Sequence, residues 1–232
     1  MAIINIETAT AVCSVALSEK GRTVFEKASF DGPSHASLLG VFVEEAVSES
    51  KCLGLTVDAV SVSGGPGSYT GLRIGVSMAK GLCFGWNVPL LSIPTLEIMA
   101  SEAVKRIPDG HQPEPLLCAM IDARRMEVYA AIYDKSLRKI RDTEAETVTE
   151  ETYAAFLEKR EVYFFGSGVS KCKDVIRSSN ALFIEGIHPL ASGMAALSER
   201  AFENGQFENG AYFEPFYLKD FVATVAKNKL LK

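Results

Sequence analysis

The 232-residue sequence lacks the histidine spacing on which metal-dependent hydrolases rely. Its three histidines, His35, His111 and His188, stand far apart, and none belongs to an H-x-x-x-H or H-E-x-x-H pair. Two histidines four residues apart place two imidazoles on one helical face, where they bind zinc or iron. We therefore expect no metal site and no cofactor, and a metallopeptidase is disfavoured.

Paired cysteine spacings are missing as well. The five cysteines lie inside apolar runs and form no C-x-x-C motif; they are Cys13, Cys52, Cys83, Cys118 and Cys172. An odd number of scattered cysteines is typical of buried free thiols in a reducing compartment, and it disfavours a disulfide framework or a zinc ribbon.

Long hydrophobic runs and an excess of basic residues are also absent. No apolar stretch reaches about 18 residues, which disfavours a membrane span. The N-terminus has no basic region, and Asn5 and Glu7 interrupt its apolar residues, so we expect a strand there and not a signal peptide. The net charge of -5 should repel a phosphate backbone, so a contact with nucleic acid has to be local or made through a partner. A cytoplasmic protein is expected.

Hydrophobic residues make up 47% of the chain, enough for one sizeable core or two small ones, and their pattern repeats. The expected order is strand, strand, strand, helix, strand, helix, strand, helix. The first copy occupies residues 2–7, 11–17, 22–30, 34–52, 57–63, 70–84, 88–93 and 95–107. After a segment rich in proline and glycine at 108–115, the second copy occupies 116–121, 127–133, 137–148, 150–157, 162–165, 169–178, 182–185 and 189–204.

This order is that of the ribonuclease-H-like unit, and its duplication resembles the architecture shared by actin, Hsp70 and the sugar kinases. We therefore expect a two-lobed α/β fold, the alternative being another alternation of strands and helices. The first lobe, 1–107, carries the partner interface, and 108–204 forms a smaller second lobe. Residues 205–232 are expected to pack back on the first lobe, with a helical run from Lys219 and a basic tip at Lys227, Lys229 and Lys232.

A glycine-rich segment joins the strand at 57–63 to the helix at 70–84. It consists of Gly65, Pro66, Gly67, Ser68, Tyr69, Thr70 and Gly71. A P-loop needs Lys and then Ser or Thr after its last glycine, where Leu72 and Arg73 stand, and a dinucleotide fingerprint has glycines one residue closer together. We expect a tight turn with Ser68 or Thr70 capping the helix, and anion binding by backbone amides remains an alternative.

Two helices show more apolar or small residues than one buried face requires. The small residues Gly71, Gly75, Ala79 and Cys83 form a stripe that lets another helix approach closely, within the fold or across an interface. The helix at 34–52 is apolar around more than one face, so its second face is a candidate interface unless the C-terminal segment covers it. The expected interface residues are His35, Leu39, Phe42, Val43, Ala46, Arg73, Val76, Ala79, Lys80 and Cys83. Such a face also predicts a homodimer when the protein is alone.

The segment GPGSYTGLRIG at 65–75 resembles a motif of the TsaB family, also called YeaZ. Weaker similarities lie at 6–10 (IETAT), 35–39 (HASLL), 94–97 (PTLE), 122–124 (DAR) and 215–218 (PFYL). One departure is Glu7, where the family commonly has Asp. The resemblance implies a heterodimer with TsaD, which carries the catalytic site, and a complex that includes the ATPase TsaE. It implies a non-catalytic subunit in the formation of threonylcarbamoyladenosine at adenosine 37 of tRNAs reading codons that begin with A. It also implies that tRNA is bound only through the complex. The helices that begin at His35 and Thr70 would contact TsaD.

An actin-like ATPase or small-molecule kinase with a degenerate nucleotide site is the alternative. Such an enzyme would hold magnesium and triphosphate near Glu7 and Asp122, with an adenine loop at 166–168. However, no glycine follows Glu7 in its hairpin, and Arg124 and Arg125 are expected to crowd and pair the carboxylate of Asp122. We therefore expect no catalytic residue.

Overall fold

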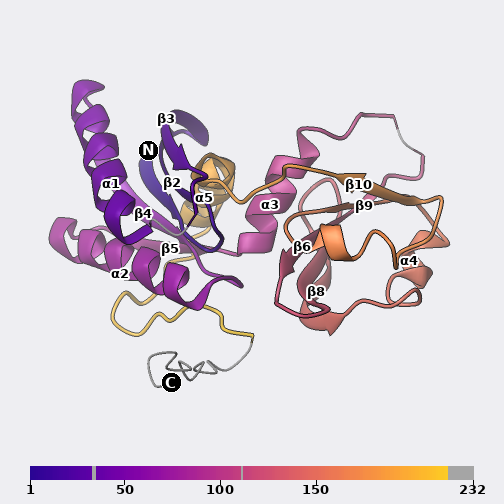
Figure 1. Ribbon diagram of the computed structural model, residues 1–232. Helices are drawn as coiled ribbons and strands as arrows, with labels where there is room; N and C mark the ends of the chain where they lie inside the picture. Colours follow the sequence, from indigo (N-terminus) through magenta and orange to yellow (C-terminus); the bar gives the residue numbers. More distant parts are fainter. Residues whose placement is uncertain (33–34, 111, 219–232) are drawn as a thin grey trace, which may run out of the picture.

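The computed structural model describes residues 1–32, 35–110 and 112–218. The chain forms two lobes, each built on a five-stranded mixed sheet (Figure 1). The strand order is β3-β2-β1-β4-β5 in the first sheet and β10-β9-β6-β7-β8 in the second. The expected two-lobed, duplicated α/β fold is confirmed. No helix within the described ranges is long and apolar enough to span a membrane.

The first lobe is built around β1, whose six residues are all buried. Ile4 and Ile6 pack with α1 and α2 on one face, and Ile3 packs with α5 on the other, so both faces are apolar. The strands pair in parallel where a helix crosses over (β1 with β4) and antiparallel where a hairpin connects them (β1 with β2). Its elements are β1 (Ala2–Glu7), β2 (Cys13–Glu19), β3 (Arg22–Ser29), α1 (His35–Cys52), β4 (Val57–Ser63), α2 (Tyr69–Trp86), β5 (Leu90–Ile93) and α3 (Thr95–Val104).

The second lobe repeats the order with reduced helices. The ten-residue helix expected at 169–178 is wrong, because the chain forms only the single 3-10 turn η1 there. That segment buries little apart from Val169, Cys172 and Ile176, too few contacts to stabilise a longer helix. The elements are β6 (Leu116–Asp122), β7 (Glu127–Tyr133), β8 (Lys139–Thr147), α4 (Ala154–Leu157), β9 (Val162–Phe165), η1 (Val169–Lys171), β10 (Ala181–Ile184), η2 (Ala191–Met194) and α5 (Ala195–Glu203).

The last helix of each copy packs against the sheet of the other lobe. α3 packs on β6 and β7 of the second sheet, whereas α5 packs on β1, β2, β3 and β5 of the first sheet. A buried hydrogen-bond network fixes α5: the Ser198 hydroxyl lies 2.7 Å from Asn5 Oδ1 and 2.8 Å from Ser61 Oγ. By its contacts α5 therefore belongs to the first lobe, although its residues fall within 108–204, the range expected for the second lobe.

Residues 205–218, called the strap below, return along the first lobe. The Glu208 amide donates to the Leu90 carbonyl (2.9 Å), and the Phe216 amide donates to the Gly64 carbonyl (2.7 Å). Between these points Phe213 packs against the core that β1 shares with α1 and α2. The helical run expected from Lys219 and the basic tip lie outside the described residues, as do the start of the expected 34–52 helix and His111.

Candidate functional site

The glycine-rich segment forms a tight turn between β4 and α2. Gly65 has φ +105°, a left-handed conformation that glycine adopts without strain. Ser68 caps α2, since its hydroxyl accepts a hydrogen bond from the Gly71 amide (3.2 Å). The Ser68 amide in turn donates to the Ala9 carbonyl (2.7 Å), which ties the turn to the end of β1. The expected tight turn is present, with Ser68 as its cap.

Several backbone amides in and next to this segment already donate hydrogen bonds within the fold. Besides Ser68 and Gly71, the Gly64 amide donates to the Ile93 carbonyl at 2.9 Å, and the Leu72 amide donates to the Ser68 carbonyl at 2.9 Å. An anion would have to displace these bonds, which weakens the alternative in which the loop cradles a phosphate.

The stripe of small residues on α2 serves a close approach within the fold. A Cβ at Gly71 would lie 2.1 Å from the Thr8 carbonyl oxygen, and one at Gly75 would lie 2.2 Å from Thr8 Oγ1. The Thr8 hydroxyl also donates to the Gly71 carbonyl at 2.8 Å. These glycines therefore let α2 lie directly on the loop that follows β1, and they are not exposed to a partner.

Glu7, the acidic residue that a kinase would need on β1, is enclosed in the first lobe. Its side chain is fully buried, and Oε1 accepts a hydrogen bond from the Ala9 amide at 2.5 Å. Burial raises the pKa of this carboxyl to about 7, against the opposing effect of hydrogen bonds from Ala9 and Ser63. Glu7 lines neither of the two hollows described below, and its 0% exposed side chain has no contact with solvent.

Asp122 at the end of β6 is bound by a lysine. Lys171 Nζ donates to Asp122 Oδ1 (2.5 Å) and to the carbonyls of Arg125 (2.9 Å) and Glu127 (2.5 Å). Partial burial raises the pKa of Asp122, yet hydrogen bonds from Lys171 and the Arg124 amide hold it below its ordinary value. The expectation that Arg124 and Arg125 pair this carboxylate is wrong, because the hairpin turn directs both side chains to solvent. No group of three or more metal-binding side chains occurs within the residues that the structure describes.

Replacing Lys171 by Met is expected to loosen the hairpin between β6 and β7. The lysine ammonium joins two carbonyls and a carboxylate of that hairpin, and losing such bonds at a partly exposed site costs about 1–2 kcal/mol. Urea unfolding should show this loss, whereas Lys173→Met, which removes the ion pair with the exposed Glu185, should cost under about 1 kcal/mol. Equal losses in the two variants would contradict this role for Lys171.

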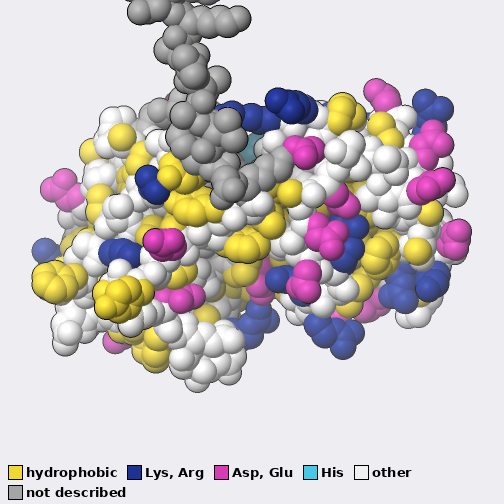
Figure 2. Space-filling view, turned by 90° about the horizontal axis from the view of Figure 1, so that it is seen from below, with side chains coloured by type: hydrophobic (Ala, Val, Ile, Leu, Met, Phe, Trp, Pro, Cys, Tyr) yellow, Lys and Arg dark blue, Asp and Glu magenta, His cyan; other side chains and the backbone are white. Residues whose placement is uncertain are grey.

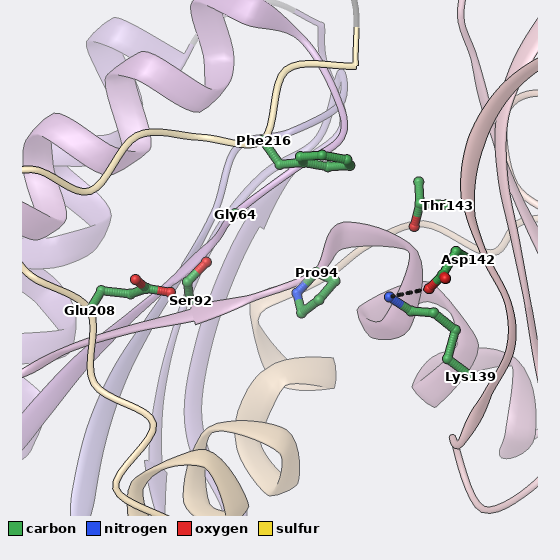
Figure 3. A pocket seen from close by; sticks show the side chains of 8 residues that line it. All are labelled: Gly64, Ser92, Pro94, Lys139, Asp142, Thr143, Glu208 and Phe216. Carbon is green, nitrogen blue, oxygen red and sulfur yellow. Dashed lines mark ion pairs between the residues drawn. The ribbon is translucent and has the colours of Figure 1, made fainter.

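A hollow of about 380 Å³ opens between the lobes (Figure 3). Ser92 and Glu208 lie on the side of the first lobe, and Lys139 pairs with Asp142 (3.9 Å) on the side of the second. A triphosphate here would meet two carboxylates and one ammonium group, and neither Glu7 nor Asp122 lines the hollow. The full lining is Gly64, Ser92, Pro94, Lys139, Asp142, Thr143, Glu208 and Phe216. This chemistry lends no support to the kinase alternative.

A second hollow, of about 610 Å³, is lined by α2 and by Ala36 in the first turn of α1, and it is called the groove below. Its lining is Ala36, Arg73, Ile74, Ser77, Met78, Gly81 and Leu82. Of these, Ile74, Met78 and Leu82 are half-buried apolar side chains four residues apart on α2. That spacing marks a helical face beside the buried stripe. It was the signal in the sequence for a surface that, apart from Arg73, the expected interface residues miss.

Most of the expected interface residues lie on the inner faces of the two helices. Six are at most 8% exposed and pack in the core; they are Leu39, Val43, Ala46, Val76, Ala79 and Cys83. The expectation that these six residues contact a partner is wrong, because they are buried in the core. When a helix is apolar around its whole circumference, its sequence does not show which face the sheet covers. His35 is also buried, with Nε2 2.8 Å from the Thr10 carbonyl oxygen. Phe42 is half-buried, Arg73 is exposed, and Lys80 donates to the Ala211 carbonyl of the strap at 3.3 Å.

Three glycines within α1 and α2 are open on the outside. A Cβ built at Gly40, Gly81 or Gly85 meets no heavy atom within 4 Å, in contrast to Gly71 and Gly75. Each helical glycine costs about 1 kcal/mol relative to alanine, and no contact among the described residues accounts for that cost here. Of the three, Gly81 lines the groove, where the backbone of α2 is open because no side chain covers it.

The surface around the groove is rich in exposed apolar side chains. Phe84 is 92% exposed, Val41 48% and Trp86 38%, all on α1 or α2. In Figure 2 hydrophobic side chains gather on the first lobe, at the left, whereas charged side chains predominate on the second lobe. Exposed apolar surfaces of this kind are frequent at sites where proteins bind one another.

Comparisons with known proteins agree with this description. A family profile described as "TsaD: tRNA N6-adenosine threonylcarbamoyltransferase" matches residues 31–227. The tRNA threonylcarbamoyladenosine biosynthesis protein TsaB of Escherichia coli K12 is 30% identical over 229 residues, which cover 96% of either chain. This chain belongs to the TsaB family. The Haemophilus influenzae TsaB is 37% identical over 130 residues, 56% of this chain and 52% of that protein. The structure of YeaZ from Pseudomonas aeruginosa has a TM-score of 0.79 at 25% identity and covers 94% of this chain and 99% of its own.

In this TsaB-family chain, the segment that carries the resemblance is part of the core rather than an open loop. Gly67 and Gly71 pack against backbone oxygens of Ala9 and Thr8, and Gly65 packs against the Phe216 carbonyl oxygen of the strap. The segment thereby joins three parts of the chain, namely the end of β1, the start of α2 and the strap. Its glycines position α2, and with it the groove.

Proposed function

We propose that this protein is a non-catalytic scaffold subunit of the machinery that forms threonylcarbamoyladenosine at adenosine 37 of tRNAs reading codons that begin with A. In this proposal it forms a heterodimer with TsaD, acts together with the ATPase TsaE, and meets tRNA only through the complex. The names of its TsaB relatives support a role in the biosynthesis of this modification. The match to a TsaD-type profile supports a partner of the same fold.

The groove and the open glycines of α1 and α2 support the proposed contact with TsaD. A helix that packs over Gly40 and Gly81 can come closer than the usual 8–10 Å between helix axes, since no side chain stands between the backbones. Ile74, Met78 and Leu82 would supply the apolar contact. A partner of the same fold presents the equivalent two helices, so a four-helix contact with approximate two-fold symmetry is the natural arrangement. In isolation a second copy of this chain would use the same surface, giving a homodimer in the cytoplasm.

The surroundings of Glu7 and Asp122, the two carboxylates that a kinase would use, support a non-catalytic role without a cofactor. Glu7 is fully buried, and Asp122 is held by Lys171. The alternative, an ATPase or small-molecule kinase, would be favoured by magnesium-dependent nucleotide turnover in purified protein that Asp122→Ala abolishes.

The test of the partner surface is a pair of substitutions at one position. Gly81→Leu is expected to weaken binding of TsaD from the same organism at least about tenfold, because the new side chain fills the groove. Gly81→Ala adds a single methyl group in open space, so it should keep the fold and most of the affinity. Isothermal titration measures both, and circular dichroism confirms folding. Unchanged affinity in a folded Gly81→Leu protein would refute the groove as the contact.

A charged residue at Ala79, in contrast, is unsuitable for this test. Ala79 is 0% exposed, so a carboxylate there would be buried without a partner and would unfold the first lobe. Loss of binding in such a variant would report misfolding and not the interface.

A further inference from the structure

The turn between β6 and β7 holds two consecutive arginines in a left-handed backbone conformation. Arg124 has φ +69° and Arg125 has φ +51°. A residue with a Cβ is strained in this region, which glycine and asparagine adopt more readily. The β2–β3 hairpin of the same chain has Lys20 and Gly21 at its two left-handed positions, so glycine relieves the strain at one of them. Arginine at both positions is unfavourable for folding, and strained backbone of this kind is concentrated at functional sites.

Hydrogen bonds fix the backbone of this turn. Lys171 Nζ donates to the carbonyls of Arg125 (2.9 Å) and Glu127 (2.5 Å). The Arg124 amide donates to Asp122 Oδ1 (2.8 Å), and the Glu127 amide donates to the Arg124 carbonyl (3.2 Å), which closes the turn. The two arginine side chains therefore extend from a fixed backbone, so a ligand does not have to order the turn when it binds.

Both guanidinium groups are accessible to a ligand. Arg124 and Arg125 are exposed, and neither guanidinium forms an ion pair with a carboxylate of the described residues. Lys171 instead offsets the charge of Asp122. A guanidinium presents its N–H donors in a planar fork that matches two oxygens of a phosphate group, and it stays charged at physiological pH. Two such groups on one turn can contact neighbouring phosphates of a nucleic-acid backbone.

We propose that Arg124 and Arg125 contact the phosphate backbone of tRNA once this protein is assembled with TsaD. The proposal rests on the proposed function, which brings the tRNA to the complex. The chain as a whole has a net charge of -5, so this contact is local and adds to the affinity of the complex. Phosphate contacts carry no base sequence, so the turn contributes affinity and orientation, and the choice of tRNA is made elsewhere.

The experiment replaces both arginines by residues that suit a left-handed backbone. Arg124→Asn with Arg125→Gly, called the turn variant below, removes both guanidinium groups and relieves the strain. Its melting temperature should equal that of the unmodified protein or lie up to about 4 °C higher. Its heterodimer with TsaD of the same organism should form normally. The probe is a transcript of a tRNA from that organism that reads a codon beginning with A.

We expect the turn variant to weaken tRNA binding by the heterodimer at least about tenfold at 0.1 M salt. The slope of the logarithm of the affinity against the logarithm of the salt concentration should decrease by about 2, about 1 for each lost phosphate contact. Fluorescence anisotropy with labelled tRNA measures both. A purely structural role of the arginines would instead lower the melting temperature and leave the salt slope unchanged.

Two further variants are matched controls. Arg124→Lys with Arg125→Lys keeps both charges and the left-handed strain, so it should keep the salt slope and lose less affinity than the turn variant. Arg138→Ala with Lys159→Ala removes two exposed charges from the opposite edge of the same sheet, where β8 and β9 begin. This second control should bind tRNA as the unmodified heterodimer does.

Four outcomes contradict the proposal. Unchanged affinity and salt slope in a folded, paired turn variant overturn it, and so does an equal loss in the Arg138 and Lys159 control, which would reduce the effect to net charge. Loss of pairing with TsaD in the turn variant would show that the arginines bind an acidic protein surface instead of RNA. If the unmodified protein does not pair with TsaD, or the pair does not bind tRNA, the proposed function itself fails, and this proposal fails with it.

Discussion

Glu7→Gln is expected to stabilise the protein at pH 8 by up to about 3 kcal/mol. The carboxyl is fully buried, and burial raises its pKa from 4.5 to about 7. Each pKa unit corresponds to about 1.4 kcal/mol of stability. The folded protein therefore keeps this proton at pH values where the unfolded chain has released it, so stability falls as the pH rises from about 4.5 to 7 and stays low above 7. Glutamine is uncharged and still accepts the hydrogen bond from the Ala9 amide.

Urea unfolding at pH 5 and pH 8 measures this effect. The free energy of unfolding of Glu7→Gln should exceed that of the unmodified protein mainly at pH 8, with a much smaller difference at pH 5. Glu150→Gln, at an exposed position on the second lobe, is the control and should change little at either pH. A difference between Glu7→Gln and the unmodified protein that is the same at both pH values would contradict the buried, titrating carboxyl.

Gly71→Ala is expected to destabilise the protein by about 3 kcal/mol, whereas Gly81→Ala on the same helix stabilises it by up to about 1 kcal/mol. The new methyl at Gly71 would lie 2.1 Å from the Thr8 carbonyl oxygen, a backbone atom, so α2 has to move away from β1. That movement also strains the hydrogen bond from Thr8 Oγ1 to the Gly71 carbonyl (2.8 Å). At Gly81 the methyl meets open space, and alanine is the better helix former.

Thermal unfolding distinguishes the two glycines. For a protein of this size 1 kcal/mol shifts the melting temperature by about 2–4 °C. Gly71→Ala should therefore melt about 6–12 °C lower than the unmodified protein, and Gly81→Ala up to about 4 °C higher. Shifts of the same sign and size in both variants would show that the close approach of α2 to β1 does not depend on Gly71.

The strands could be placed from the sequence because their signal is local. The expected bounds of β1, β4, β7 and β9 coincide with those in the structure, since runs of β-branched and aromatic residues end at turn residues. The helix expected at 169–178 failed because helix length depends on burial, and the segment after η1 finds little to pack against. The exchange of α3 and α5 between the lobes depends on contacts between residues far apart in the chain, such as Ser198 with Asn5.

The candidate site, too, could be predicted only in part from the sequence. Sequence pointed to α1 and α2, yet it assigned the inner residues Val43 and Ala79 to the interface and missed Ile74 and Met78 beside the groove. Apolar residues surround both helices, so periodicity alone could not separate the face that the sheet covers from the face that borders the groove.

The duplicated order of strands and helices, the family and the tight turn at 65–75 could all be predicted before any coordinates, because they follow from local patterns and residue types. Which glycines are in close contact with other parts of the chain became clear from the packing of α2: Gly71 lies against Thr8, whereas Gly81 is open to the outside. Folding also encloses Glu7 and binds Asp122 to Lys171. Burial and close approach are properties of surfaces that folding brings together, so two identical residues ten positions apart on one helix can lie in different environments.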